Sequence, residues 1–303
     1  MSPDASVSNT AQSLSPDRQD IVQKAIAEIS HIATLPEVTI KIIKLVEDPD
    51  STAQDLNKVI SNDPALGARI LKVVNSAFYG LPGQIGSINR AIVLLGLNAV
   101  KNIAIAASLA KLFHGGQICP GFDAKELWAH SMGVAAATKH LAHKIGLGLP
   151  DEAFLAGLIH DLGIMVEVQA RRPKFVEAFE KLSADPSLSF REAELQVIGA
   201  THEDFGTALC KLWKFPMSLV YVTGFHHRPL DLAPEHRTLA CLVHLADIVT
   251  ARAKVGFTRS VESLEASPDV LQDVGLAPQD IDEICEGLPD AMEQADHVLQ
   301  DVA

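Results

Sequence analysis

The chain has 303 residues, of which 48% are hydrophobic and 5% aromatic, and its formal net charge is −13. This composition supports a large core, and the few aromatic residues favour packed helices over β-sandwiches. The acidic balance argues against nucleic acid as the main partner, because sequence-independent binding of nucleic acids depends on clustered Lys and Arg. The length is that of one large domain or two modest ones.

Cysteine usage and the first residues bear on the compartment. The four cysteines lie far apart and form no CxxC pair, so they predict neither a thiolate zinc site nor a disulfide framework. The opening MSPDASVSNTAQSLSPDRQD has neither the basic region nor the apolar core of a signal peptide. No apolar run reaches the about 20 residues that span a bilayer. We therefore expect a cytoplasmic protein that is not bound to a membrane.

The first half of the chain has the pattern of short helices. Residues 1–18 are rich in Ser, Asp, Pro and Asn without periodicity, which indicates a mobile tail. From residue 19 apolar residues recur at helical spacing. Ser51 or Thr52 can cap one helix and Ser87 another, and Gly96 can end the latter. We predict an N-terminal helical subdomain over residues 19–116.

A Gly/Pro-containing loop, HGGQICPGFD at 114–123, separates this half from a second helical set. Asp123 and Asp151 are the expected N-caps of two of its helices, the second of which carries EAFLAGLIHDLGIMVEVQA. We predict a second helical subdomain over 117–258 and acidic short helices over 259–303. No useful strand alternation is present, so the expected fold is all-α, with two packed bundles.

The stretch GLIHDLGIM places His160 and Asp161 side by side in an apolar run. Charged residues are seldom fully buried unless they are paired or coordinate a metal. Further His and carboxylate residues lie on predicted helices or at their ends, and Glu126 and His130, four apart, share one helix face. The full candidate set is Glu126, His130, His160, Asp161, His202, His226, His227 and Asp247.

Imidazole and carboxylate ligands without sulfur suit iron, manganese, zinc or nickel. Eight ligands exceed the needs of one tetrahedral ion, but they suit two octahedral ions with Asp161 as a bridge. Such a pair could clamp a phosphate. The alternative is that these side chains pack in a helical scaffold, since a single histidine on an apolar face is usually a core residue. The remaining histidines are assigned to the core or the surface: His31, His114, His140, His143, His236, His244 and His297.

Two long parts of the sequence resemble a known family. Residues 35–96, with LPEV, ISNDPALGARILKVVNSAFYG and IGSINRAIVLLG, resemble the N-terminal half of the HDOD domain. Residues 119–250 resemble its HD half, which is related to HD-type phosphohydrolases and HD-GYP phosphodiesterases. In HD-GYP-like proteins the ligands follow in the order His, HD, His, HH and Asp, and this chain has the same order. The resemblance implies that His130, His160, Asp161 and Asp247 hold one ion, and that His202, His226, His227 and the shared Asp161 hold the second. Iron is the preferred metal.

Two departures from HD-GYP enzymes bear on activity. Ile164 stands where those enzymes commonly have a lysine, and HHRPLDLAP replaces the segment with GYP, although Arg228 could supply part of the charge. We therefore weigh a bacterial regulatory protein that contacts signalling partners against a metal-dependent phosphohydrolase or phosphodiesterase, acting on a nucleotide, a cyclic dinucleotide or another phosphate-containing small molecule. The oligomeric state is left open.

The stretch VVNSAFYG is expected to have a structural role. Asn75 and Ser76 can bond to backbone groups where a helix ends. Tyr79 is expected to pack against the loop LPGQIG.

Overall fold

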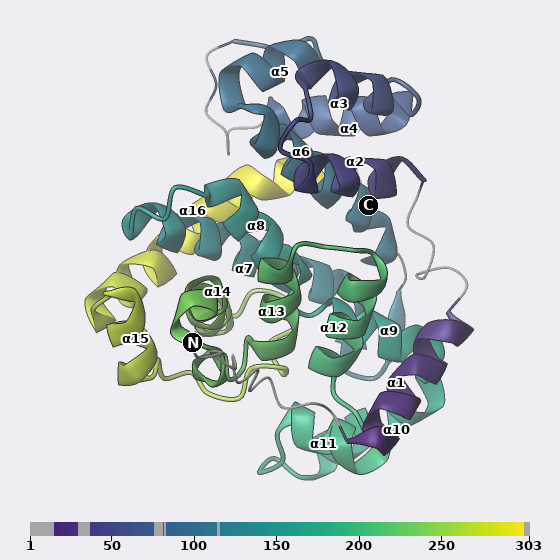
Figure 1. Cartoon of the computed structure of the whole chain (residues 1–303). Helices are drawn as coiled ribbons and strands as arrows, with labels where there is room; N and C mark the ends of the chain where they lie inside the picture. Colours follow the sequence, from purple (N-terminus) through teal and green to yellow (C-terminus); the bar gives the residue numbers. More distant parts are fainter. Residues whose placement is uncertain (1–14, 30–36, 76–80, 82, 114–115, 300–303) are drawn as a thin grey trace, which may run out of the picture.

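The computed structural model describes residues 15–29, 37–75, 81, 83–113 and 116–299. Over these residues the chain is almost entirely helical, as the sequence predicts. Figure 1 shows a smaller group of helices, α2 to α6, above a larger bundle formed by the helices from α7 onward. The fold class is therefore all-α.

The first helix belongs in space to the larger bundle. α1 (Pro16–Glu28) begins after Ser15, whose side chain accepts from the Arg18 amide, and it packs on α9 (Leu162–Ala170) and α12 (His202–Leu212). Arg18 Nε donates to Asp204 Oδ2 at 2.6 Å. This ion pair fastens α1 to the first turn of α12, the turn that starts with a candidate ligand.

The upper helices gather around one central helix. They are α2 (Glu37–Glu47), α3 (Ala53–Ile60), α4 (Pro64–Val74), α5 (Ile88–Leu95) and α6 (Leu97–Leu109). Thr52 and Ser87 are the N-caps of α3 and α5, and Gly96 ends α5, as predicted. The buried α6 contacts α2, α4 and α5 on one side and α8 (Pro150–Ile159) on the other. It therefore connects the two groups of helices.

Asn75 closes the end of α4. Its amide Nδ2 donates to the carbonyls of Leu71 and Ile85 at 2.8 Å each, and its Oδ1 accepts from the Ile85 amide at 2.5 Å. All these bonds join backbone groups of the turn, as expected for a polar side chain at a helix end. Ser76 and Tyr79 lie outside the described residues.

The predicted loop at 114–123 contains a small hairpin. After the 3₁₀ turn η1 (Ala110–Phe113), β1 (Gln117–Cys119) and β2 (Phe122–Asp123) pair antiparallel, with Gln117 opposite Asp123 and Cys119 opposite Phe122. Two such short strands leave the helical class unchanged.

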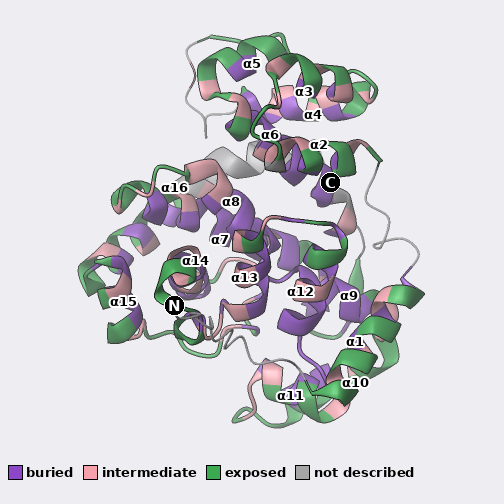
Figure 2. Ribbon diagram, in the orientation of Figure 1, coloured by how far each residue is buried: buried purple, intermediate pink, exposed green. Residues whose placement is uncertain are grey.

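The larger bundle is built on the long helices α7 (Ala124–Lys144) and α14 (Pro234–Arg252). α7 packs on α8 and α14, and Figure 2 shows α7, α8, α9 and α12 as predominantly buried. Its other elements are α10 (Arg172–Ala184), α11 (Phe190–Val197), α13 (Met217–Phe225), η2 (Pro229–Asp231), α15 (Pro268–Val274) and α16 (Pro278–Leu299).

The structure confirms one of the two N-caps that the sequence predicts for the bundle. Asp123 caps α7 and accepts from the Lys125 amide at 2.8 Å, as predicted. The prediction for Asp151 was wrong, because α8 begins at Pro150 with Leu149 as its N-cap, and Asp151 lies in the first turn. Proline is favoured at the first helical position, since its fixed φ suits the helix and it lacks an N–H that would have no partner there.

The prediction that no apolar run reaches the length of a bilayer span was wrong, because the stretch Pro150–Ala170, which covers α8 and α9, is long and apolar enough by length and composition alone. In the fold, however, 89% of its apolar window is buried, as in the core helices of a soluble protein.

Candidate metal centre

The His160–Asp161 pair lies at a break between two helices. The sequence predicts one continuous helix here, but α8 ends with His160 as its C-cap, and α9 begins after Asp161, whose φ is −95° and ψ 14°. Gly163 then brings α9 against α12, because a Cβ on this glycine would lie 1.8 Å from the His202 carbonyl oxygen. Asp161 Oδ1 thereby lies 3.4 Å from Nε2 of His202, the first residue of α12, while the ring of His160 lies beside that of His130.

Two groups of possible ligands meet at Asp161. One contains His130, His160 and Asp161, and the other contains Asp161, His202, His226 and His227; within each group the ligand atoms lie within 4.8 Å of one another. Asp247 joins the first group, since its Oδ1 lies 2.9 Å from His130 Nε2 and 3.9 Å from His160 Nε2. Seven of the eight candidates thus converge from α7, α12, α14, the α8–α9 break and the two residues that follow α13.

Glu126 is the exception and requires a correction. Its side chain is exposed and belongs to neither group. A step of four residues raises a helix position by about 6 Å along the axis, so a shared face does not bring both side chains to the same point. The backbone of Glu126 has a local role instead, because its carbonyl accepts from the Phe257 amide at 2.9 Å.

The hydrogen bonds of two histidines fix which ring nitrogen faces the centre. The Nδ1 atoms of His160 and His226 lie 2.7 Å and 3.2 Å from the carbonyl oxygens of Gly157 and Val222. A carbonyl oxygen only accepts, so each Nδ1 carries a proton and Nε2 is the ring nitrogen left to face the interior; it offers a lone pair to a cation whenever it carries no proton. This is the arrangement that a metal-binding histidine requires.

The two Nε2 atoms lie close to carboxylate oxygens and to another imidazole nitrogen. His160 Nε2 lies 3.3 Å from Asp161 Oδ2, and His226 Nε2 lies 3.3 Å from Asp161 Oδ1 and from His202 Nε2. Among the described residues, His160 Nε2 and Asp161 Oδ1 have no hydrogen-bond partner although both are fully buried. Buried polar atoms without partners are costly. The donor set therefore fits bound cations, and the buried His/Asp cluster could hold divalent metal.

The pKa values reflect the same crowding. Burial alone lowers the pKa of His160, but the carboxylate of Asp161, and then that of Asp247, outweigh it and raise the pKa to about 9. Burial raises the pKa of Asp161, but the neighbouring histidines, His160 first, lower it well below its usual value. The pKa of His227 is lowered by burial and by His226 and His202. A carboxylate that stays ionised among histidines is a strong ligand for a metal.

Sequence reasoning missed a second layer of carboxyl groups. Glu194 on α11 is fully buried, and its Oε1 lies 2.8 Å from Nδ1 of His202. Burial raises the pKa of Glu194, and burial together with the charge of Glu194 raises the pKa of Glu167 on α9. Carboxyl groups that contact the second nitrogen of a ligand histidine orient its ring. Glu167 lies in GIMVEVQA, where a carboxylate within an apolar run was a signal of the same kind as the HD pair.

The arginine side chains near the centre are paired with carboxylates, and no lysine replaces them at position 164. Ile164, at the position of the expected lysine, is fully buried. The buried carboxylate of Glu203 forms an ion pair with Arg191 Nη2 at 2.8 Å and lies 3.6 Å from Arg228 Nε. Arg228 also pairs with Asp231 at 3.5 Å. A ligand phosphate would have to compete with these carboxylates for Arg228.

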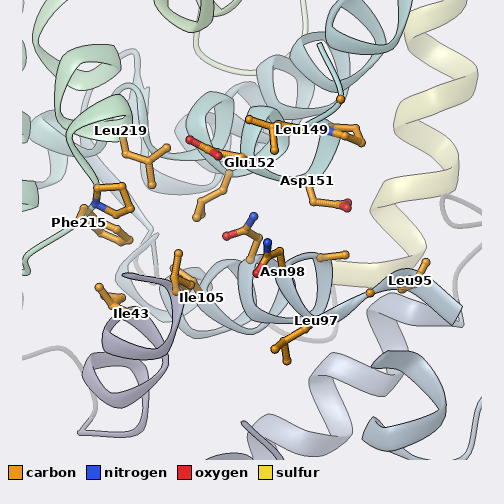
Figure 3. A pocket seen from close by; sticks show the side chains of 18 residues that line it. Ile43, Leu95, Leu97, Asn98, Ile105, Leu149, Asp151, Glu152, Phe215 and Leu219 are labelled. Atoms are coloured by element: carbon orange, nitrogen blue, oxygen red, sulfur yellow. The ribbon is translucent and has the colours of Figure 1, made fainter. Parts of the chain in front are cut away.

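Two hollows differ in their relation to the centre. A pocket of about 410 Å³ is lined by His227 and Asp247 together with Arg228 and His244, so it opens on the cluster. A larger cleft of about 940 Å³ lies between the two groups of helices and contains none of the candidate ligands. Figure 3 shows its apolar walls and the acidic side chains of Asp151 and Glu152. The smaller pocket therefore gives access to the cluster at His227 and Asp247.

Comparisons with known proteins agree with this architecture. Crystal structures similar to the chain include an HDOD domain protein of unknown function from Geobacter sulfurreducens (TM-score 0.79, 24% identity, 93% of this chain and 98% of that one). They also include a putative phosphohydrolase from Shewanella amazonensis (TM-score 0.73, 24% identity, 93% and 98% covered). At these identities the likeness establishes the fold.

Sequence comparison gives a relative and a family. An uncharacterized protein of Treponema pallidum is 25% identical over 221 residues, which are 73% of this chain. The match spans 42% of that relative's length. The family model of the HDOD domain matches residues 32–229, more than half of the chain. The protein therefore belongs to the HDOD family.

Proposed function

We propose that this chain is a bacterial regulatory protein of the cytoplasm, which holds two divalent metal ions, preferably iron, and acts mainly through contacts with signalling proteins. The observation that supports a two-metal centre is the presence of Asp161 in both ligand groups. A carboxylate with one oxygen toward each group suits a bridge between two ions. His130, His160 and Asp247 would complete one ion's ligands, and His202, His226 and His227 those of the other.

Bound ions of this kind supply Lewis-acid chemistry toward phosphate oxygens. The chain's own residues supply less of what phosphoester hydrolysis needs, namely charge that holds the phosphate and stabilises the leaving group. Ile164 provides no charge, and Arg228 is shared with Glu203 and Asp231. Loss of one charge-assisted contact costs ~2–4 kcal/mol, or roughly 30- to 1000-fold in rate. We therefore expect weak or no hydrolysis of cyclic dinucleotides.

The test combines metal content with turnover. The full chain, loaded with iron or manganese, should contain two ions by elemental analysis. The His160→Ala/Asp161→Ala variant should lose both, because it removes the bridge and a ligand. The matched control is His140→Ala, which changes an exposed histidine on α7 and should keep both ions.

Hydrolysis of cyclic di-GMP and of a chromogenic phosphodiester should be weak in the unmodified protein and rise in Ile164→Lys if that variant folds. Brisk hydrolysis by the unmodified protein, abolished in the double alanine variant, would overturn the regulatory proposal in favour of an enzyme.

One observation favours a second candidate, a metal-dependent phosphohydrolase. The pocket of about 410 Å³ reaches His227 and Asp247, and Arg228 lies at its wall. A mononucleotide substrate in the same assay distinguishes the candidates, since brisk turnover of it alone would support this enzyme.

A further inference from the structure

The segment that follows α14 crosses back over the metal centre. It begins with Lys254 and Gly256 in left-handed conformations, with φ of 56° and 62°. A Cβ on Gly256 would lie 2.2 Å from the Glu126 carbonyl oxygen, so only glycine allows this approach to α7. Phe257 then donates its amide to the same carbonyl at 2.9 Å. The segment is thus held against the turn of α7 that precedes His130.

Contacts on both sides of Ser260 hold the segment in place. The ring of Phe257 packs edge-on against that of Phe122, with centroids 5.0 Å apart. Beyond Ser260, Glu262 pairs with Arg191 at 3.1 Å. The family match ends at residue 229, so this segment lies outside it.

Ser260 lies between these anchors and contacts the bridging carboxylate. It is 1% exposed, and its hydroxyl donates to Asp161 Oδ2 at 3.0 Å. Oδ2 is the oxygen nearer His160, whereas Oδ1 lies 3.3 Å from His226 and 3.4 Å from His202. A carboxylate oxygen accepts more than one partner, so the hydroxyl does not exclude an ion from Oδ2.

We infer that Ser260 is a positioning residue, which holds the Asp161 carboxylate in the orientation that presents one oxygen to each ion. This inference rests on the proposed two-metal function. Without the hydroxyl, Oδ2 loses its fixed partner and the carboxylate can rotate. The subsite of His130 and His160 is then weakened more than the subsite of His202, His226 and His227. Loss of a partner that orients a metal ligand typically reduces metal affinity by ~10- to 100-fold.

The experiment is a manganese titration of the full chain, followed by paramagnetic resonance and elemental analysis. The unmodified protein should take up two ions and give the signal of a coupled pair. Ser260→Ala should bind one of them ~10- to 100-fold more weakly and give the signal of a single ion at intermediate manganese. Ser260→Thr keeps the hydroxyl and should restore the pair. Ser263→Ala, an exposed serine in the same segment, is the matched control and should leave both affinities unchanged.

Two outcomes overturn the inference in distinguishable ways. If the unmodified protein binds two coupled ions and Ser260→Ala binds both with the same affinities, the role of Ser260 is refuted while the two-metal proposal stands. If the unmodified protein does not bind two ions, both are refuted. If Ser260→Ala unfolds without metal, Ser260→Cys, of similar size and with a weaker donor, replaces it and should give a smaller loss in the same subsite.

Discussion

The upper helices α2–α6 and the bundle around α7 and α14 both bury ionisable side chains, but with different surroundings. Lys101 on α6 is 2% exposed, and its ammonium donates to the Leu45 carbonyl and, at 2.5 Å, to Ser51 Oγ. In the bundle, His160 Nε2 and Asp161 Oδ1 are equally buried and have no hydrogen-bond partner among the described residues. A buried charge with partners is a structural element, whereas unpartnered ligand atoms that converge from several helices, as His160 Nε2 and Asp161 Oδ1 do, fit a bound cation.

The two regions also differ in how closely their helices approach. Gly163 on α9 lies so near α12 that a Cβ would overlap the His202 carbonyl. Gly67 on α4 has the space that a side chain needs, since the nearest atom to a Cβ there is Ile60 Cγ2 at 3.5 Å. The helices therefore approach each other most closely where the candidate ligands from several helices converge.

Removal of metal tests the first difference and should have the largest effect. An ion that binds only the folded state stabilises it by about 4 kcal/mol when its concentration is about 1,000 times its Kd. We expect a chelator to lower the free energy of unfolding by about this amount for each tightly bound ion, with the loss of hydrogen-exchange protection concentrated in α7, α12 and α14. The His160→Ala/Asp161→Ala variant should not respond to the chelator. An equal response from it would mean that the buried cluster is not the metal site.

Gly163→Ala tests the second difference. The methyl group would meet backbone atoms of His202 and Gly206, which cannot move aside as a flexible side chain could. We expect a destabilisation of about 3 kcal/mol or more in urea unfolding. Manganese binding at the His202 subsite should also weaken. Unchanged stability and metal content would show that α9 and α12 are not in backbone contact at Gly163.

Asn75→Ala tests whether polar side chains of the upper region are structural. The change removes the partners of the Ile85 amide and carbonyl. We expect the free energy of unfolding to fall by ~1–3 kcal/mol while metal content stays the same. The opposite result, in which metal is lost and stability is unchanged, would show that the role of Asn75 is not structural.

Gly67→Ala should have the smallest effect and the opposite sign. Alanine in a helix interior is favoured over glycine by roughly 0.5–1 kcal/mol, and a methyl group at Gly67 would make only an ordinary van der Waals contact with Ile60. Urea unfolding should therefore show a small stabilisation. A destabilisation would mean that α4 is packed as tightly as α9, and the contrast between the regions would fail.

Much of the fold was predictable from local signals. Thr52, Ser87 and Asp123 cap helices where the sequence predicts them, since capping depends on neighbouring residues alone. The break between α8 and α9 was not predictable from periodicity, because HDLG continues the apolar pattern without a proline. The hairpin in the 114–123 loop was also missed, since its two strands are too short to show alternation.

The sequence by itself determined the chemistry of the candidate centre. The residue types and their order along the chain identify the histidines and aspartates that converge, because an ionisable side chain in an apolar run must find a partner. The tertiary structure alone decided which of them share a point, and it left Glu126 at the surface. It also supplied Glu194 from α11 and Ser260, which lies 99 residues from Asp161. Contacts at such separation depend on how helices pack, and that packing is set by the whole core rather than by any local pattern.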